Sequence, residues 1–150
     1  MSELSAERAA SIEASFNRQG VLLGMGGRMA SIDVGRCTLE LPFGDAVAQQ
    51  HGFFAGGAIG TLADVAGGYA AMSVAPAGRD VLTLEYKINF LRPATGVLLT
   101  ATASVLRAGR SAIVTRIDVT DDQDRLCATM RQTIVPAPDA SGQASGKREA

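Results

Sequence analysis

The stretch that decides the fold is "GGAIGTLADVAGGYAAMSV", residues 56–74, which is rich in alanine and glycine. It has helical length, and the proline and glycine of "APAGRD" at 75–80 end a helix there. Small side chains let a helix and a sheet approach each other closely. The stretch therefore predicts a buried central helix over residues 56–74.

Strand patterns fill the second half of the chain. In "LTLEYKINF", residues 82–90, Tyr86 and Ile88 alternate with Thr83 and Glu85, which predicts that the two pairs point to opposite faces of a strand. The connections between the strand segments are too short for crossover helices, so the segments predict an antiparallel meander. The four predicted strands are residues 82–90, 97–106, 111–120 and 125–135.

The first half of the chain predicts a helix followed by two strands. Residues 4–17 have a helical pattern, with Ser5 as the N-cap and with Ile12 and Phe16 on one face. Residues 19–27, "QGVLLGMGG", are expected to form a connection that ends this helix. The two strands are predicted near residues 28–34 and 36–42.

Together these elements predict an α+β protein in which one curved antiparallel sheet wraps around a long central helix. A chain of 150 residues has the size of one domain with one core. We expect a single domain over residues 1–136. Residues 137–150 are small and polar, and we expect them to be a disordered tail.

Composition argues against several classes of protein. The net charge is −1 and charges of both signs are scattered, which argues against a nucleic-acid-binding face. No segment has the apolar character of a signal peptide core or of a membrane span. One histidine and two isolated cysteines are too few for a zinc site, so no metal is expected. We expect a cytoplasmic protein in which Cys37 and Cys127 are buried, reduced thiols.

Asp64 is the residue of the central helix that points to function. It is the only ionisable carboxylate between Ala46 and Gly78, a stretch that contains no lysine or arginine. Aspartate is unfavourable inside a helix and is unfavourable to bury without a partner. Helical spacing places Asp64 on a face whose residues have almost no side chains, which leaves room for a ligand. That face contains Gly56, Gly60, Gly67 or Gly68, and Ala71.

The start of the helix supplies donors that complement this carboxylate. Gly56 and Gly57 are the first helical residues, where unpaired N–H groups and the helix dipole favour a developing oxyanion. The amide of Gln49 can donate to a carbonyl or hold a water. These groups suit a general base or nucleophile at Asp64. The alternative is that Asp64 only hydrogen-bonds a backbone group or a partner subunit.

Three segments carry a family resemblance: "QHGFFAGGAIGTLADVAGGYA" at 50–70, "YKINFLRPA" at 86–94 and "RAGRSAIVTRIDV" at 107–119. Together they resemble the hotdog-fold thioesterases of the PaaI-like acyl-CoA group, and the resemblance covers residues 20–136. It implies a curved antiparallel sheet around a central helix, sheets paired edge to edge in a homodimer, and dimers that often pair into tetramers. It also implies that acyl-CoA thioesters are hydrolysed at the dimer interface without a metal or organic cofactor.

The resemblance assigns roles to three residues. Gln49 takes the place of the family's Gln or Asn, Gly56 that of the glycine whose N–H polarises the thioester carbonyl, and Asp64 that of the catalytic carboxylate. In such enzymes Asp64 faces Gln49 and Gly56 of the other subunit. Two positions depart from the family pattern, because its histidine falls on Ala55 and its Ser or Thr one turn after the carboxylate falls on Gly68.

Further residues are candidates for contact with the substrate, and most of them have a structural alternative. Arg107 and Arg110 flank a turn that lies near the CoA nucleotide in the family, but they also fit solvated turn charges. Phe54 either lines the acyl pocket or packs under the helix, and His51 either touches the substrate or holds its loop. The set of candidates is His51, Phe54, Gly57, Gly68, Arg107 and Arg110.

The sequence therefore predicts an acyl-CoA thioesterase in which Asp64 activates water or attacks the thioester directly. Two alternatives stay open. A non-catalytic acyl-CoA-binding hotdog protein is favoured by Ala55 at the histidine position. A dehydratase or hydratase acting on acyl thioesters requires a carboxylate paired with a histidine, and the only histidine here precedes the helix.

Overall fold

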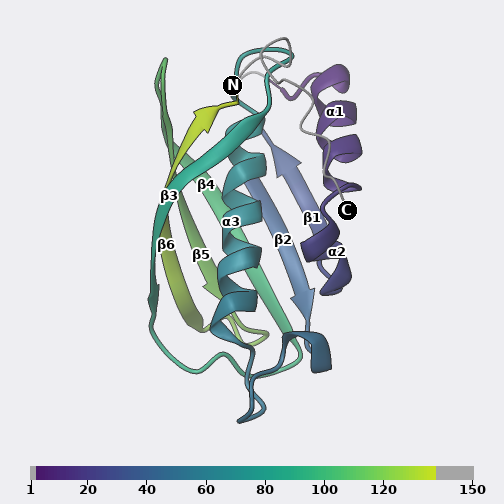
Figure 1. The fold of residues 1–150 in the computed structure, drawn as a ribbon, viewed down its shortest axis with the longest axis vertical. Coiled ribbons are helices and arrows are strands. Elements are labelled where there is room, and N and C mark those ends of the chain that lie inside the picture. The colour runs from purple at the N-terminus through teal and green to yellow at the C-terminus, as the bar shows by residue number, and fades with distance from the viewer. Residues whose placement is uncertain (1–2, 138–150) are drawn as a thin grey trace, which may run out of the picture.

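The computed structural model describes residues 3–137. Two helices and two strands come first, then a 3-10 turn, the long helix and four strands (Figure 1). The helices are α1 (Ala6–Phe16), α2 (Gly20–Gly24), η1 (Asp45–Val47, a 3-10 helix) and α3 (Gly56–Met72). The strands are β1 (Arg28–Asp33), β2 (Arg36–Pro42), β3 (Val81–Phe90), β4 (Leu98–Ala108), β5 (Ile113–Thr120) and β6 (Leu126–Pro136).

The strands form one six-stranded sheet in the order β1-β2-β4-β5-β6-β3, and every neighbouring pair is antiparallel. The sheet curves around α3, which lies along its concave face, while α1 lies next to β1 at the edge of the sheet and contacts α3 through Phe16 (Figure 1). The predicted α+β architecture, a curved antiparallel sheet around a long central helix, is confirmed. Only part of the predicted meander forms, however.

The correction concerns β3. Strands β4, β5 and β6 pair in sequence, as a meander requires, but β3 pairs with β6 and not with β4. The loop of residues 91–97 carries the chain across the end of the sheet, so that β4 can pair with β2. Hydrogen bonds hold its main chain at Leu91, whose N–H donates to Cys127 O, at Ala94, whose carbonyl accepts from Phe54 N–H, and at Val97, whose carbonyl accepts from Phe43 N–H. As a result β3 is an edge strand.

The core explains why the central helix is rich in small residues. Many positions of α3 are buried, and the helix contacts the sheet through alanine and glycine as well as through larger side chains. Burying one Leu or Ile side chain contributes about 1.5–3 kcal/mol, so this interface is a large part of the folding free energy. The central cluster includes Leu39, Leu41, Ile59, Leu62, Ala63, Ala66, Leu99, Ile117 and Met130.

The N-terminal segment packs on the same core. The helix predicted over residues 4–17 forms Ala6–Phe16, and the Ser5 hydroxyl accepts from Arg8 N–H at 3.1 Å, as expected of an N-cap. Phe16 packs edge-on against Tyr69 of α3, with the ring centroids 5.6 Å apart. The expected connection over residues 19–27 contains the short helix α2, because buried Leu22 anchors one turn there.

The cysteines, the C-terminal tail and the length of the helices bear on three further expectations. Cys37 and Cys127 are free thiols and both are buried, as predicted, and burial raises the pKa of Cys37 to about 12. The predicted disordered tail, residues 137–150, lies outside the described residues except for Ala137, whose N–H donates to Asp80 O at 2.8 Å. No helix in the described part of the chain has both the length and the apolar character needed to cross a membrane.

Candidate active site

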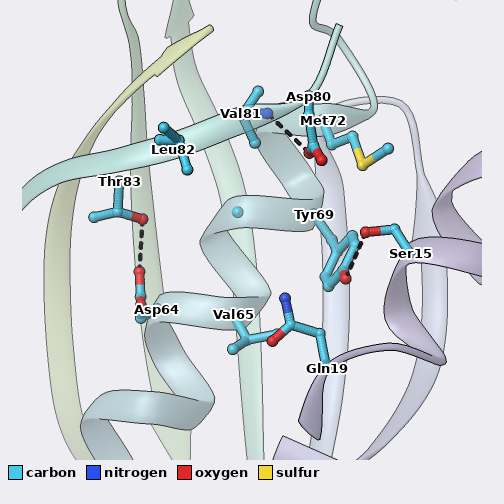
Figure 2. A pocket seen from close by; sticks show the side chains of 11 residues that line it. Ser15, Gln19, Asp64, Val65, Tyr69, Met72, Asp80, Val81, Leu82 and Thr83 are labelled. Carbon is cyan, nitrogen blue, oxygen red and sulfur yellow. Dashed lines mark hydrogen bonds between the residues drawn. The ribbon is translucent and has the colours of Figure 1, made fainter. Parts of the chain in front are cut away.

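Asp64 lies on α3 at the mouth of a cavity of about 380 Å³, between α1, α3 and the start of β3 (Figure 2). Its side chain is half-buried. The cavity has a polar side at Asp64 and Thr83 and a second polar point at Ser15 and Tyr69, whose hydroxyls are 3.0 Å apart. Its lining residues are Ser15, Gln19, Asp64, Val65, Gly68, Tyr69, Met72, Asp80, Val81, Leu82 and Thr83.

Two side chains hold one oxygen of the Asp64 carboxylate. The Thr83 hydroxyl donates to Oδ1 at 2.7 Å, and the Gln132 amide nitrogen donates to the same oxygen at 2.5 Å. Among the described residues, these are the hydrogen bonds made by the carboxylate, and both end on Oδ1. The second oxygen, Oδ2, is therefore available to accept from a water or to attack a ligand.

Thr83 reaches Asp64 because β3 contains a bulge. Thr83 pairs with Ile134 and Glu85 pairs with Thr133, so Leu84 is an extra residue on β3. The prediction that Thr83 shares the face of Glu85 is wrong, since the extra residue turns Thr83 towards α3. A β-bulge next to a reactive side chain is a known means of aiming a neighbouring residue.

The predicted open glycine face of α3 is largely covered by β3. A methyl group built on Gly56 would lie 3.3 Å from the Phe90 ring, and one on Gly60 would lie 3.7 Å from the Tyr86 hydroxyl. Gly67 points into the core and not into the cavity. Gly68 remains open, because nothing lies within 4 Å of a methyl group at that position. The free space beside Asp64 is therefore on the Gly68 side.

Gly56 borders a second cavity of about 500 Å³ at the other end of α3. The N-cap position of α3 is Ala55, whose side chain makes no capping hydrogen bond, so the first N–H groups of the helix lack a side-chain partner. Gly56 and Gly57 are both exposed. This cavity is lined by Gln49, Phe53, Phe54, Gly56, Ile59, Phe90, Leu91, Arg92, Pro93 and Ala94.

Gln49 and His51 form one turn before α3. The Gln49 side-chain oxygen accepts from His51 N–H, which leaves the Gln49 amide nitrogen as the end that can donate to a ligand. The His51 side chain is exposed, and it lines neither the Asp64 cavity nor the Gly56 cavity. In the single chain, the part of this turn that faces the second cavity is therefore Gln49.

A single chain does not bring the predicted catalytic residues together. Asp64 and Gly56 are eight residues apart on one helix, which separates them by about 12 Å along its axis. Asp64 borders one cavity, whereas Gln49 and Gly56 border the other. Each chain thus presents two separate halves of the predicted site.

The structure places the other predicted contact residues in different settings. Phe54 is 3% exposed and packs edge-on against Phe43, with the ring centroids 5.0 Å apart, so it is a core residue that also borders the Gly56 cavity. Arg107 and Arg110 are exposed at the β4–β5 turn and line neither cavity. Arg92, in contrast, lines the Gly56 cavity.

Gln132 and Thr83 were missed as site residues by the sequence analysis. A usable signal existed for Gln132, because alternation along β6 places it on the same side as Met130 and Ile134, which are buried. A polar residue at such a position requires a buried hydrogen-bond partner. No local signal identifies Thr83, since its direction depends on the bulge. Within residues 3–137, no cluster of His, Cys, Asp or Glu side chains forms a candidate metal site.

Comparison with known proteins gives the family of this chain. The model of the thioesterase superfamily matches residues 51–128, from the turn before α3 to the first residues of β6. The chain belongs to the thioesterase superfamily. A crystal structure of a thioesterase family protein from Silicibacter pomeroyi is 37% identical and has a TM-score of 0.82, with 86% of this chain and 97% of that chain covered.

Two further proteins are similar to this chain. The E. coli PaaI protein of the phenylacetic acid degradation operon has a TM-score of 0.82 at 26% identity, with 90% of this chain and 96% of that chain covered. A 1,4-dihydroxy-2-naphthoyl-CoA hydrolase from Listeria monocytogenes is 30% identical over 73% of this chain and 89% of its own length. The predicted hotdog fold and the PaaI-like resemblance are confirmed.

Proposed function

We propose that this member of the thioesterase superfamily is an acyl-CoA thioesterase whose reacting carboxylate is Asp64. The observation that carries the proposal is the state of that carboxylate, since two donors hold Oδ1, Oδ2 accepts no hydrogen bond from the described residues, and Asp64 lines a cavity. A carboxylate held in this way suits a general base or a nucleophile. The Listeria relative, which is named a CoA hydrolase, supports the same substrate class.

The proposed site is completed by a second copy of the chain. In one chain Asp64 and Gly56 border different cavities, so neither cavity contains both the carboxylate and the oxyanion donor. Strand β3 has a free edge and exposes apolar side chains. Its unpaired backbone groups would favour aggregation of a monomer, but they also allow the edge to pair with a strand of another chain. The exposed fractions are 54% for Leu82, 67% for Leu84, 45% for Tyr86 and 53% for Phe90.

Pairing of two β3 edges is the arrangement we propose for a homodimer with two equivalent sites at the interface. A two-fold interface places the same strand of each chain against its copy. Asp64 of one chain would then face Gln49 and Gly56 of the other. We also propose that two such dimers associate into a tetramer, and the molecular mass of the protein in solution tests this.

The proposed reaction is hydrolysis of the thioester by water. Gly56 N–H and the Gln49 amide stabilise negative charge on the carbonyl oxygen. In one route Asp64 Oδ2 removes a proton from water, whose oxygen bonds to the carbonyl carbon, and the carbon–sulfur bond then breaks to release the free acid and the thiolate. In the other route Oδ2 attacks the carbonyl carbon itself, the thiolate leaves, and water then hydrolyses the mixed anhydride to release the free acid and restore Asp64. A thiol has a pKa of about 8.5, so the thiolate leaves without a strong acid. CoA is part of the substrate, and the proposed mechanism uses no metal or organic cofactor.

The CoA phosphates require cations near the mouth of the site. Arg92 is the arginine that lines the Gly56 cavity, and its guanidinium can pair with phosphate oxygens. Arg107 and Arg110 stay candidates at the β4–β5 turn, which is exposed. Gly57 lies in the first turn of α3 and His51 in the turn that precedes the helix, so both stay candidates for contact with the substrate. Gly68 leaves space for the acyl group beside Asp64.

One observation favours a second function, that of a non-catalytic acyl-CoA-binding protein. Ala55 and Gly68 lack the polar groups found at those family positions, and the described structure has open space at Gly68. A hydratase or dehydratase is less well supported, because it requires a carboxylate–histidine pair, and His51 lines neither the Asp64 cavity nor the Gly56 cavity that the proposed dimer brings to it.

The test is a panel of acyl-CoA thioesters assayed with a thiol reagent that detects released CoA. The two cysteines of the protein are buried, and burial raises the pKa of both, so they react slowly and give little background. Wild type should release CoA, and Asp64→Asn should lose that activity. Asp45→Asn, an exposed carboxylate in η1, serves as the matched control and should retain it.

Each outcome of this assay has a distinct meaning. Release of CoA that is unchanged in Asp64→Asn shows that the catalytic assignment is wrong. Tight binding of acyl-CoA by wild type without any release of thiol supports the non-catalytic function. Analytical ultracentrifugation of the same samples tests the proposed dimer.

A further inference from the structure

Gln132 of β6 and Thr115 of β5 are polar side chains in the interior of the protein. Both are 0% exposed, and they lie directly opposite each other in the β5–β6 register. A buried polar group must be hydrogen-bonded, because leaving it unpaired is strongly unfavourable. The position of Gln132 therefore depends on the partners that it finds in this part of the core.

The partners allow only one orientation of the Gln132 amide. An ionised carboxylate accepts hydrogen bonds and cannot donate them, so the amide must present its nitrogen to Asp64. The Thr115 hydroxyl donates to Gln132 Oε1 at 2.9 Å from the opposite side. The amide nitrogen then donates to Asp64 Oδ1 at 2.5 Å and lies 2.9 Å from Thr83 Oγ1.

The helix leaves room for this amide at a single position. A methyl group built on Gly67 would overlap Gln132 Oε1 and lie 2.9 Å from Ile117 Cδ1, so no residue larger than glycine fits without displacing the amide. The neighbouring Gly68 faces open space. Gly67 thus lets the interior amide reach the main chain of α3, where Gln132 Nε2 is also 3.1 Å from Asp64 O.

We propose that Gln132 is a positioning residue for Asp64, and that Thr115 holds the Gln132 amide in place from the opposite side. The pair holds Oδ1 from inside the core while Thr83 holds it from β3, so that Oδ2 is the oxygen that acts on the substrate (Figure 2 shows the Thr83 contact). This inference rests on the proposed thioesterase function and deepens it. Gln132 does not line the cavity and acts only through Asp64.

The experiment compares four single variants with wild type in the acyl-CoA assay. Gln132→Met removes the amide at similar size. Thr115→Val removes the hydroxyl that holds the amide oxygen, and Thr115→Ser retains it. Ile117→Val is the control for a small change in the same buried layer, because the Ile117 side chain makes none of the hydrogen bonds that hold Asp64 and Gln132. The Gln132→Met and Thr115→Val changes are also made in the Asp64→Asn background.

The expected result is a selective loss of kcat. Misplacement of a reacting group by about 1 Å lowers the rate by about 100-fold, so Gln132→Met should lower kcat by about 10- to 100-fold, with KM within about threefold of wild type. Thr115→Val should lower kcat less, Thr115→Ser should restore it, and Ile117→Val should retain it. In the Asp64→Asn background, neither change should lower the residual rate further, because the group that they position is already lost.

Several results would overturn the inference. A Gln132→Met protein with kcat within twofold of wild type contradicts it, as does an equal loss in both backgrounds, which indicates a general structural effect. If Gln132→Met does not fold, the Thr115→Val and Thr115→Ser pair decides, and equal kcat values for these two contradict the inference. A wild type that hydrolyses no thioester contradicts the proposed function, and the inference falls with it.

Discussion

Two carboxylates of this protein, Asp64 on α3 and Asp121 at the β5–β6 turn, are held by hydrogen bonds in different ways. Asp121 uses both oxygens: Oδ1 accepts from the N–H groups of Gln123 and Arg125, and Oδ2 accepts from the Arg125 guanidinium at 2.8 Å. Asp64 accepts on Oδ1 from two neutral donors, Thr83 and Gln132, and no salt bridge to it is seen in residues 3–137.

The difference is the one expected between a structural carboxylate and the catalytic carboxylate that we propose at Asp64. When both oxygens accept hydrogen bonds and a cation is paired, the carboxylate stabilises a turn and has little capacity left for a ligand. When one oxygen is held and the other is free, the group is oriented and can still take part in chemistry. The surroundings of Asp64 thus support its proposed catalytic role more strongly than its presence in a helix does.

The largest expected effect is that substitution of Asp64 lowers kcat but not the melting temperature, whereas substitution of Asp121 lowers the melting temperature but not kcat. Asp64→Asn should lower kcat by about 10²–10⁴-fold, because the general base or nucleophile is lost, and should leave the melting temperature near that of wild type. Asp121→Asn should lower the melting temperature and retain kcat. Steady-state kinetics and calorimetry on the three proteins test this. Loss of activity in both variants, or of stability in both, would contradict the distinction.

A second expectation concerns Gly56, the proposed oxyanion donor at the other end of α3. Gly56→Pro removes one N–H at the first helical position, where proline is tolerated, and Ala55 already has the extended conformation that proline requires of its neighbour (φ −67°, ψ 142°). We expect a loss of about 10²–10³-fold in kcat. Gly56→Ala retains the N–H and should lower kcat much less. Because its methyl group also lies against Phe90, this variant separates the effect of losing the N–H donor from the effect of crowding against that ring.

Mixing inactive variants tests whether the two halves come from different chains. In a mixed dimer of Asp64→Asn and Gly56→Pro, one site carries both changes and the other carries neither. Equal amounts of the two proteins, exchanged at random, should therefore recover about a quarter of wild-type activity. No recovery, despite exchange of subunits shown by mass spectrometry, would place both halves of each site in one chain.

Alanine substitutions at the adjacent glycines 67 and 68 should change the free energy of unfolding by smaller amounts and in opposite directions. Gly67→Ala should destabilise the protein by about 1–3 kcal/mol, because its methyl group would overlap Gln132 and Ile117. Gly68→Ala should stabilise it by about 0.5–1 kcal/mol, because the position is open and alanine favours the helix. Urea unfolding measures both free energies. Equal effects at the two positions would mean that Gly67 is not needed for the interior amide.

The smallest expected effect is the pH dependence of the Asp121 turn. Burial alone opposes ionisation of Asp121, but the N–H donors of Arg125 and Gln123 and the Arg125 guanidinium lower its pKa below the ordinary value. Its contribution to stability is thus present above the unfolded-state pKa of about 3.9 and is lost as the pH falls through the lower folded-state value. Urea unfolding at pH 7, 4 and 3 should show a smaller acid destabilisation in Asp121→Asn than in wild type.

Local sequence patterns by themselves determined the elements of this protein and its leading candidate residue. The helix at 56–74 and the strands of the second half follow from composition and from periods of 3.6 and 2 residues, which act over a few neighbours. Asp64 stands out in the same way, because a lone carboxylate in a run of small apolar residues has no local explanation. The thioesterase resemblance is likewise carried by short segments of the sequence.

Only the tertiary structure decided how distant parts of the chain meet. It paired β3 with β6, added the bulge that turns Thr83 towards Asp64, and brought Gln132 and Thr115 behind the carboxylate. It also placed Asp64 and Gly56 at separate cavities of one chain. These facts depend on contacts between residues dozens of positions apart, and such contacts are set by packing of the whole sheet against α3. No local periodicity encodes that packing.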